Sequence, residues 1–215
     1  MQGARFQALG SFLVALNPLV DRLFAKGFGA GAISHLEYAG RLWNMVPLLF
    51  AGTLTIAHAN WSRTASSSKL DMHKVHASAA RLGGIALVFS VLVMLCSDLF
   101  IDTLYGWGKI DAAHRVSLSA LLKAYLAGSA PFVAGLVYVR ALSALGRISL
   151  ITVAASINAG ANLILDWLMT SIYGLIGIGL ATSVTYAIVT LFLAVYFKNP
   201  SSESQLPIKN YDCTV

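Results

Sequence analysis

The segment IYGLIGIGLATSVTYAIVTLFLAVYF, residues 172–197, contains no charged side chain. A helix needs about 20 apolar residues to cross the hydrocarbon core of a bilayer, so this segment predicts a membrane-spanning helix. Tyr173, Tyr196 and Phe197 lie near its two ends, and aromatic rings of this kind gather at the membrane–water interface. Because a helix satisfies its own backbone hydrogen bonds in lipid, we expect an all-helical fold.

Five further segments have a similar length and character. The chain is 57% hydrophobic and 11% charged, whereas soluble domains carry about 25% charged residues. We therefore predict an all-α membrane protein, a bundle of six transmembrane helices over residues 1–197. Polar loops are expected at 61–81, where the segment has room for a short amphipathic helix, and at 105–115. A mobile polar tail is expected at 198–215. The helices are expected at about 5–24, 33–59, 82–104, 116–143, 148–170 and 172–197.

Lysine and arginine are distributed unequally between the two predicted ends of the bundle. Cytoplasmic ends of membrane helices carry an excess of these residues, so the richer end, with both termini, is predicted to be cytoplasmic. The net charge of +6 then belongs to a membrane face, and no nucleic-acid partner is expected. The richer end has nine basic residues (Arg5, Arg63, Lys69, Lys74, Arg81, Arg140, Arg147, Lys198, Lys209) and the other has four (Arg22, Lys26, Lys109, Arg115).

Motifs of enzyme chemistry are missing from the sequence. It contains no nucleophile motif, phosphate-binding loop or dinucleotide fingerprint, and its two cysteines have no metal-binding or disulfide spacing. Asp98 and Asp102, four residues apart near a predicted helix end, could bind a cation but are interpreted as solvated carboxylates. We expect no catalytic residue, no metal site and no cofactor, and a coupling ion is not identified.

Polar residues inside predicted membrane helices are the functional candidates, because such residues usually face a bundle interior or a cavity. In HLEYAGRLWNMVP, residues 35–47, Glu37 lies four residues before Arg41 on the same helical face. Asn44 lies near that face, and Pro47 is expected to kink the helix. Two interpretations of Arg41 remain open: it faces a cavity, or it pairs with Glu37 and reaches the interface.

Two later helices carry further polar candidates. Lys123, seven residues into its helix, reaches the interface in the favoured interpretation and lines a cavity beside Tyr125 in the other. Asn158 and Asn162 lie one turn apart, which favours hydrogen bonding between packed helices. Asp166 continues the same stripe and is expected close to the outer interface.

The segment NPLVDRLFAKGFGAGAISHLEYAGRLWNMVPLLFAGTLTIAHANWSR, residues 17–63, resembles the central signature of the MurJ/MviN lipid II flippases. These belong to the multidrug/oligosaccharidyl-lipid/polysaccharide exporter superfamily. Weaker similarity extends the resemblance to about residues 10–197. The chain departs from the family pattern at Gly40, where the family has an acid that Glu37 could replace, and at Ala59, where it has proline. The matching positions are Asp21, Phe24, Ala25, the turn at 27–31, Ser34, Leu36, Tyr38, Ala39, Arg41, Leu42, Pro47, Ser62 and Arg63.

The resemblance implies that Arg41 faces a central cavity and binds the pyrophosphate of a lipid-linked substrate. Glu37, Asn44 and Lys123 are the other substrate-binding candidates. The remaining polar candidates, with a coupling or structural role, are Asp21, Asn158 and Asn162. The implied function is translocation of a lipid-linked peptidoglycan precursor across the bacterial inner membrane by alternating access.

The family has about fourteen helices in two six-helix lobes plus two more, and the chain matches only the second lobe. The implied partners are therefore a missing N-terminal lobe or a second copy, beside the lipid-linked glycan and membrane lipids. Two alternatives remain open: export of another lipid-linked oligosaccharide, and a non-transporting scaffold or partner subunit. A drug antiporter is disfavoured, because it would favour acids over arginine in the cavity.

Overall fold

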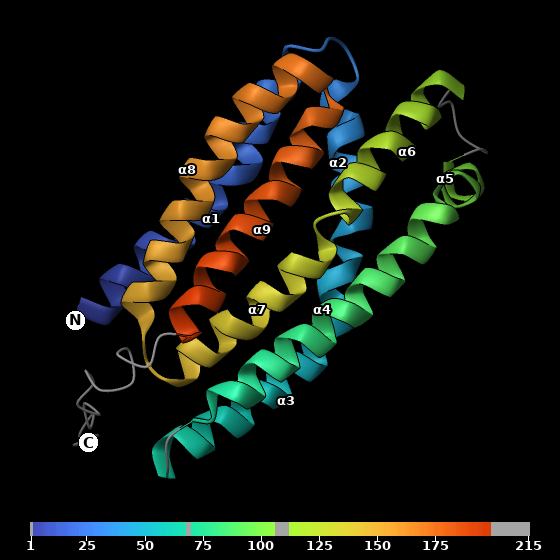
Figure 1. Ribbon diagram of the computed structural model, residues 1–215. Coiled ribbons are helices and arrows are strands. Elements are labelled where there is room, and N and C mark those ends of the chain that lie inside the picture. Colours follow the sequence, from blue (N-terminus) through green and yellow to red (C-terminus); the bar gives the residue numbers. More distant parts are fainter. Residues whose placement is uncertain (1, 68–69, 106–111, 199–215) are drawn as a thin grey trace.

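The computed structural model describes residues 2–67, 70–105 and 112–198. Within these residues the chain forms nine helices and no strand (Figure 1). The predicted tail, beyond Lys198, and residues 106–111 of the predicted second loop lie outside them. The helices are α1 (Gln2–Lys26), α2 (Ala32–Trp43), α3 (Met45–Ser67), α4 (Met72–Leu95), α5 (Ser97–Tyr105), α6 (Ala112–Leu126), α7 (Ser129–Ala144), α8 (Ile148–Tyr173) and α9 (Ile176–Lys198).

These helices provide up to six membrane spans in an elongated bundle. Five stretches are long and apolar enough to cross a bilayer, and α6 with α7 forms a sixth if the bent pair is one span. The first residues of α1 and the last of α9 lie at the same end of the bundle (Figure 1). The predicted all-α, six-span fold is confirmed.

The second span is broken at the position where proline was expected to act. α2 ends at Trp43 and α3 begins at Met45, with Asn44 between them. Pro47, in the first turn of α3, has no N–H to offer the carbonyl of Trp43, so the helical ladder is interrupted there. α2 and α3 together still form one long candidate span, Ala32–Ala65, and the break is a single residue inside it.

The segment 61–81 is more helical than predicted, because the two long helices α3 and α4 take up most of it where a polar loop with at most a short amphipathic helix was expected. α3 continues to Ser67 and α4 begins at Met72. The Asp71 carboxylate caps α4 by accepting a hydrogen bond from the His73 amide at 3.0 Å, which satisfies a backbone donor that the first turn leaves unpaired. Val75 and Ala79 are buried, and α4 packs along α7. Mean hydropathy does not reveal this narrow apolar face.

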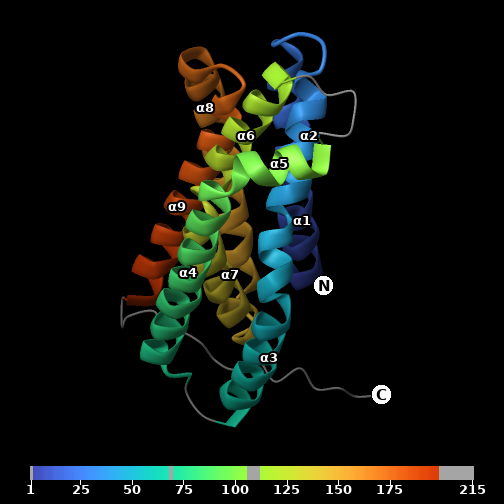
Figure 2. The ribbon, with the colours of Figure 1, turned by 90° about the vertical axis from the view of Figure 1, so that its right-hand side faces the viewer.

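The helix predicted at 82–104 is also wrong in its bounds. α4 ends at Leu95, and α5 follows as a separate short helix that runs across the direction of α4 (Figure 2). α5 packs on α6. α5 therefore does not continue the span formed by α4.

The single helix predicted at 116–143 consists of α6 and α7, which are bent by 41°. Pro131 has no N–H for the carbonyl of Ala127, so the ladder is interrupted at this point. From α9, the Ser183 hydroxyl donates to the carbonyl of Ala124 at 2.6 Å. A neighbouring helix thus satisfies a carbonyl freed by the break, as the membrane interior requires.

Small residues on one face of α9 allow close packing against α6. Gly177, Gly179, Ala181 and Ser183 are all buried. A Cβ atom at Gly179 would lie 2.9 Å from the Cβ of Ala124, so only glycine permits this approach. Gly174 forms the turn after α8 with a φ of 62°. α8 accordingly continues to Tyr173, beyond the end predicted at residue 170.

Candidate functional site

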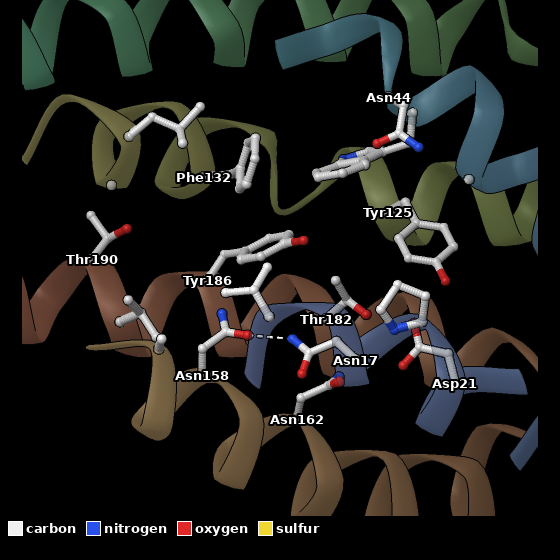
Figure 3. A pocket seen from close by; sticks show the side chains of 18 of the residues that line it. Asn17, Asp21, Asn44, Tyr125, Phe132, Asn158, Asn162, Thr182, Tyr186 and Thr190 are labelled. Atoms are coloured by element: carbon white, nitrogen blue, oxygen red, sulfur yellow. Dashed lines mark hydrogen bonds between the residues drawn. The ribbon is translucent and has the colours of Figure 1, made fainter. Parts of the chain in front are cut away.

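A cavity of about 590 Å³ lies among the helices that enclose the middle of the bundle. Its lining comes from α1, α2, α6, α7, α8 and α9 (Figure 3). The polar and charged residues in this lining are Asn17, Asp21, Arg22, Glu37, Arg41, Asn44, Tyr125, Asn158, Asn162, Thr182, Tyr186 and Thr190. Six of the seven predicted site residues are therefore brought to one cavity.

Arg41, Glu37 and Asn44 all line this cavity from α2 and its C-terminal cap. The alternative interpretation, in which Arg41 pairs with Glu37, is wrong, because Glu37 Oε1 accepts a hydrogen bond from Arg22 Nε of α1 at 2.6 Å. Among the described residues, no ion pair or hydrogen bond engages the Arg41 guanidinium. A cation with no internal partner in a cavity is suited to an anionic ligand.

Amide side chains form a row on one wall of the cavity. Asn17 of α1 donates a hydrogen bond to Asn158 of α8, and Asn162 lies one turn further along α8 (Figure 3). The predicted hydrogen bonding between packed helices is confirmed for Asn158. Asn162 differs, because its Oδ1 is buried and has no hydrogen-bond partner in the described part of the chain.

One fully buried carboxylate, Asp166, and one partly buried carboxylate, Asp21, lie beside this amide row. Asp21 of α1 has Asp166 and Asn162 of α8 as its polar neighbours. The expectation that Asp166 lies near the outer interface is wrong, since its side chain is fully buried. Asp21 Oδ1 and both Asp166 carboxylate oxygens have no hydrogen-bond partner within the described residues. Unpaired buried oxygens are costly, so this cluster is suited to a cation or a shared proton.

Aromatic side chains form the wall opposite the amides. Trp43 stacks on Tyr186, with ring centroids 5.5 Å apart and an interplanar angle of 11°, and meets the edge of Phe132 at 4.9 Å. Tyr125 lies next to Trp43, with a centroid separation of 6.2 Å. Trp43 comes from the α2–α3 break, while Tyr125 and Phe132 flank the α6–α7 break (Figure 3). Three of the rings in the aromatic wall therefore lie at or next to a helix break.

Lys123 is the predicted site residue that does not line the cavity. Its ammonium lies 3.1 Å from Asp98 Oδ2 of α5. Ser119 also donates to Asp98 Oδ1 at 2.5 Å. The Ser119 hydroxyl and the Lys123 ammonium hold the pKa of Asp98 below its ordinary value. The Asp98–Lys123 pair joins α5 to α6, and neither residue lines the cavity.

Asp102 pairs with Arg115 of α6 at 2.9 Å. The interpretation of Asp98 and Asp102 as merely solvated is therefore wrong, because each pairs with a cation of α6. Among the described residues, no group of three or more histidine, cysteine or acidic side chains could hold a metal ion. The carboxylates of Asp21 and Asp166, together with the amide oxygen of Asn162, remain the best oxygen donors for a cation.

Sequence reasoning missed Asn17, Arg22 and the aromatic wall as parts of the site. Asn17 lies four residues before Asp21, and this spacing places both on one face of α1. Asn17 could therefore have been identified from the sequence. The ion pair of Arg22 with Glu37 could not, because it depends on how α1 and α2 fold back on each other.

Comparisons with known proteins agree with this architecture. The family described as "Lipid II flippase MurJ" matches residues 2–208. A solved structure of the lipid II flippase MurJ in an inward closed conformation superposes with a TM-score of 0.81 at 25% identity, over 88% of this chain and 41% of that one. A search of the curated proteins finds no match.

Two other transporters share the fold. An outward-facing multidrug resistance MATE family transporter of the MOP superfamily gives a TM-score of 0.74 at 19% identity, over 94% of this chain and 45% of that one. A MOP superfamily transporter from Pyrococcus furiosus gives 0.64 at 20% identity, over 89% of this chain and 42% of that one.

The chain thus spans less than half the length of these solved transporters. The match of the family covers nearly the whole sequence, and the apolar helices describe a multi-pass membrane protein. The chain belongs to the MurJ lipid II flippase family.

Proposed function

We propose that this chain acts as one lobe of a flippase that moves a polyprenyl-pyrophosphate glycolipid, a peptidoglycan precursor, across the bacterial inner membrane. The observation that carries the proposal is Arg41, which lines the cavity without a partner among the described residues. A guanidinium can hold phosphate oxygens through two parallel hydrogen bonds. Bound in this way, the headgroup phosphates would be neutralised inside the membrane while the lipid tail stays in the bilayer.

The rest of the cavity supports a glycolipid headgroup. Asn44, Asn158 and Asn162 line it with amide groups, which can both donate and accept hydrogen bonds. The aromatic wall offers apolar ring surface opposite them. Amides and aromatic rings together suit a sugar, which has polar hydroxyl groups and apolar ring faces. We place no substrate role on Lys123, because Asp98 engages it outside the cavity.

A transport cycle of this kind needs an energy source, and the buried acids support one. Asp21, Asp166 and Asn162 present oxygen atoms without protein donors among the described residues. Such oxygens fit a monovalent cation or a proton, which would supply the charge that the carboxylates lack. We propose that occupancy of this cluster by a coupling ion controls how tightly α1 packs on α8, the two helices that carry it.

Alternating access requires two lobes that move against each other. We therefore propose that the partner is a first lobe or a second copy of this chain, seated over the cavity. The positive-inside rule supports the richer basic end of the bundle, which holds both termini, as the cytoplasmic end. The membrane lipids around the lobe would contact its apolar outer faces.

The test is rescue of a bacterium depleted of its own lipid II flippase. The chain is expressed alone or with the first lobe of a MurJ protein, as wild type and as Arg41→Ala. Lys26→Ala provides a control cation on α1 that does not line the cavity. Immunoblots of membrane fractions check that every variant reaches the same level.

Rescue that needs a first lobe and is lost in Arg41→Ala supports the proposal. Rescue by the chain alone favours a second copy as the partner. Growth that survives Arg41→Ala would remove this residue from the mechanism. If well-expressed wild type never rescues, lipid II is not the substrate, and export of another lipid-linked oligosaccharide or a non-transporting role becomes the better account.

A further inference from the structure

Arg22 lines the cavity, but the proposed function gives it no role in pyrophosphate binding. It lies near the C-terminal end of α1, and its Nε donates to Glu37 Oε1 of α2 at 2.6 Å. Both side chains line the cavity and are partly exposed, at 50% for Arg22 and 36% for Glu37. The pair therefore joins α1 and α2 at a place that a ligand can reach.

Much of the Arg22 guanidinium remains available to a ligand. Glu37 engages only Nε, and no other hydrogen bond of Arg22 occurs within the described residues. A guanidinium has five N–H donors in a planar fork, so the terminal nitrogens stay free to bind oxygen atoms. Glu37 thus occupies Arg22 without saturating it.

Arg41 lies one helical turn from Glu37 on α2, and one turn advances about 5.4 Å along the axis. Gly40, next to Arg41, also lines the cavity, and a Cβ atom built there would meet nothing within 4 Å. No side chain at position 40 therefore fills this space or supplies a charge. Arg41 and Glu37 thus line the cavity one turn apart on α2, and Glu37 contacts Arg22 of α1.

We propose that Arg22 and Arg41 form a two-arginine clamp for a diphosphate group, in which Glu37 is an exchangeable counter-ion. Glu37 holds Arg22 in the empty cavity and is displaced when the anion binds. The inference rests on the proposed function, because it assigns a second binding residue to the same phosphate site. It also changes the role of Glu37 from substrate ligand to competitor of the substrate.

The exposure of the ion pair makes the exchange favourable. An ion pair in contact with water contributes little net stability, so the loss of the Arg22–Glu37 contact costs little. A diphosphate carries several negative charges and can accept bidentate hydrogen bonds from two guanidinium groups, which are among the stronger hydrogen bonds in proteins. The anion therefore outcompetes a single carboxylate that reaches one nitrogen.

The test measures binding to the purified full chain in detergent by isothermal titration calorimetry. The two probes are inorganic diphosphate and farnesyl diphosphate, at one fixed ionic strength. The variants are Arg22→Ala, Glu37→Gln, the double variant and Arg41→Ala, with Lys26→Ala as the control cation of α1. Thermal unfolding of each variant verifies that it is folded.

Arg22→Ala should weaken the binding of both probes about tenfold, the effect of losing one charge-assisted contact. Glu37→Gln, which keeps the shape of the side chain, should tighten binding several-fold, because it removes the competing carboxylate. In the Arg22→Ala background, Glu37→Gln should have much less effect, since Glu37 acts through Arg22. Lys26→Ala should leave both affinities unchanged.

A further variant, Gly40→Asp, places an acid beside Arg41 in open space. It should weaken binding by supplying a second internal competitor. The fold changes should be the same for both probes, because they share the anion. Tighter binding of farnesyl diphosphate would assign the site to a lipid-linked diphosphate, and equal affinities would assign it to the free anion.

Weaker binding in Glu37→Gln would overturn the exchange, because Glu37 would then be a ligand or a structural support. If Arg41→Ala weakens binding while Arg22→Ala and Glu37→Gln leave the affinity unchanged, the clamp is overturned and the proposed function stays intact. If none of the three substitutions changes the affinity, the phosphate site itself is rejected, and with it the proposed function.

Discussion

Gly128 tests whether the break between α6 and α7 is held as closely against α9 as the structure indicates. A Cβ atom at this position would lie 2.6 Å from the Cα of Ser183 and 2.6 Å from its hydroxyl oxygen. The backbone of Gly128 has a φ of −84°, which any residue adopts, so Gly128→Ala introduces a steric change without backbone strain. Overpacking of this kind costs about 1–3 kcal/mol.

For a chain of this size, each kcal/mol shifts the melting temperature by roughly 2–4 °C. Gly128→Ala should therefore lower the melting temperature by about 5 °C, measured by thermal unfolding of the purified protein in detergent. The matched control is Gly84→Ala in α4, where a Cβ atom would meet nothing within 4 Å. It should leave the melting temperature unchanged or raise it slightly, because alanine favours a helix over glycine.

Equal melting temperatures for the two variants would refute the reasoning. The close approach of α9 to the break would then be absent, and the hydrogen bond from Ser183 to the carbonyl of Ala124 could not be what satisfies the broken helix. Placement of Tyr125 and Phe132 in the aromatic wall would also need another explanation, because both flank this break.

Three more substitutions test the site and its surroundings. Trp43→Ala should destabilise the protein by about 3 kcal/mol, since Trp43 is 7% exposed and loses its aromatic neighbours, whereas Trp167→Ala, at 68% exposed, should change the melting temperature little. Hydrogen bonds from Ser119 and Lys123 hold the pKa of Asp98 below its ordinary value, so the contribution of Asp98 to stability is present at neutral pH and is lost as pH falls below about 3.9. The difference in melting temperature between wild type and Asp98→Asn should therefore shrink between pH 6 and pH 3. A constant difference would contradict this. Asp21→Asn should abolish rescue in the growth assay while diphosphate binding stays within about twofold, because Asp21 is proposed to serve coupling; parallel loss of both would assign it to the substrate site instead.

The positions of the spans could be predicted from local composition. Segments such as 172–197 are apolar over a sufficient length, and lipid leaves the backbone no alternative to a helix. The Asn158–Asn162 stripe also follows from helical spacing. For Arg41 the spacing left two interpretations open, and only the family resemblance implied that this residue faces a cavity. The kink near Pro47 follows from the chemistry of proline alone.

Other features could not be predicted, because they depend on contacts between distant segments. The helical state of 61–67 and 72–81 rests on the Asp71 cap and on packing of Val75 against the bundle. Lys123 could reach the interface or a cavity by its position, and only α5, with Asp98, decided between them.

The amino-acid sequence by itself determined that this protein is a helical membrane lobe of the MurJ type with an arginine in its interior. Only the tertiary structure decided the partners of each charge. It paired Glu37 with Arg22, left Arg41 open to the cavity, and buried Asp166 beside Asp21. The physical reason is that hydropathy and helical period act within one segment, whereas an ion pair depends on which helices fold together.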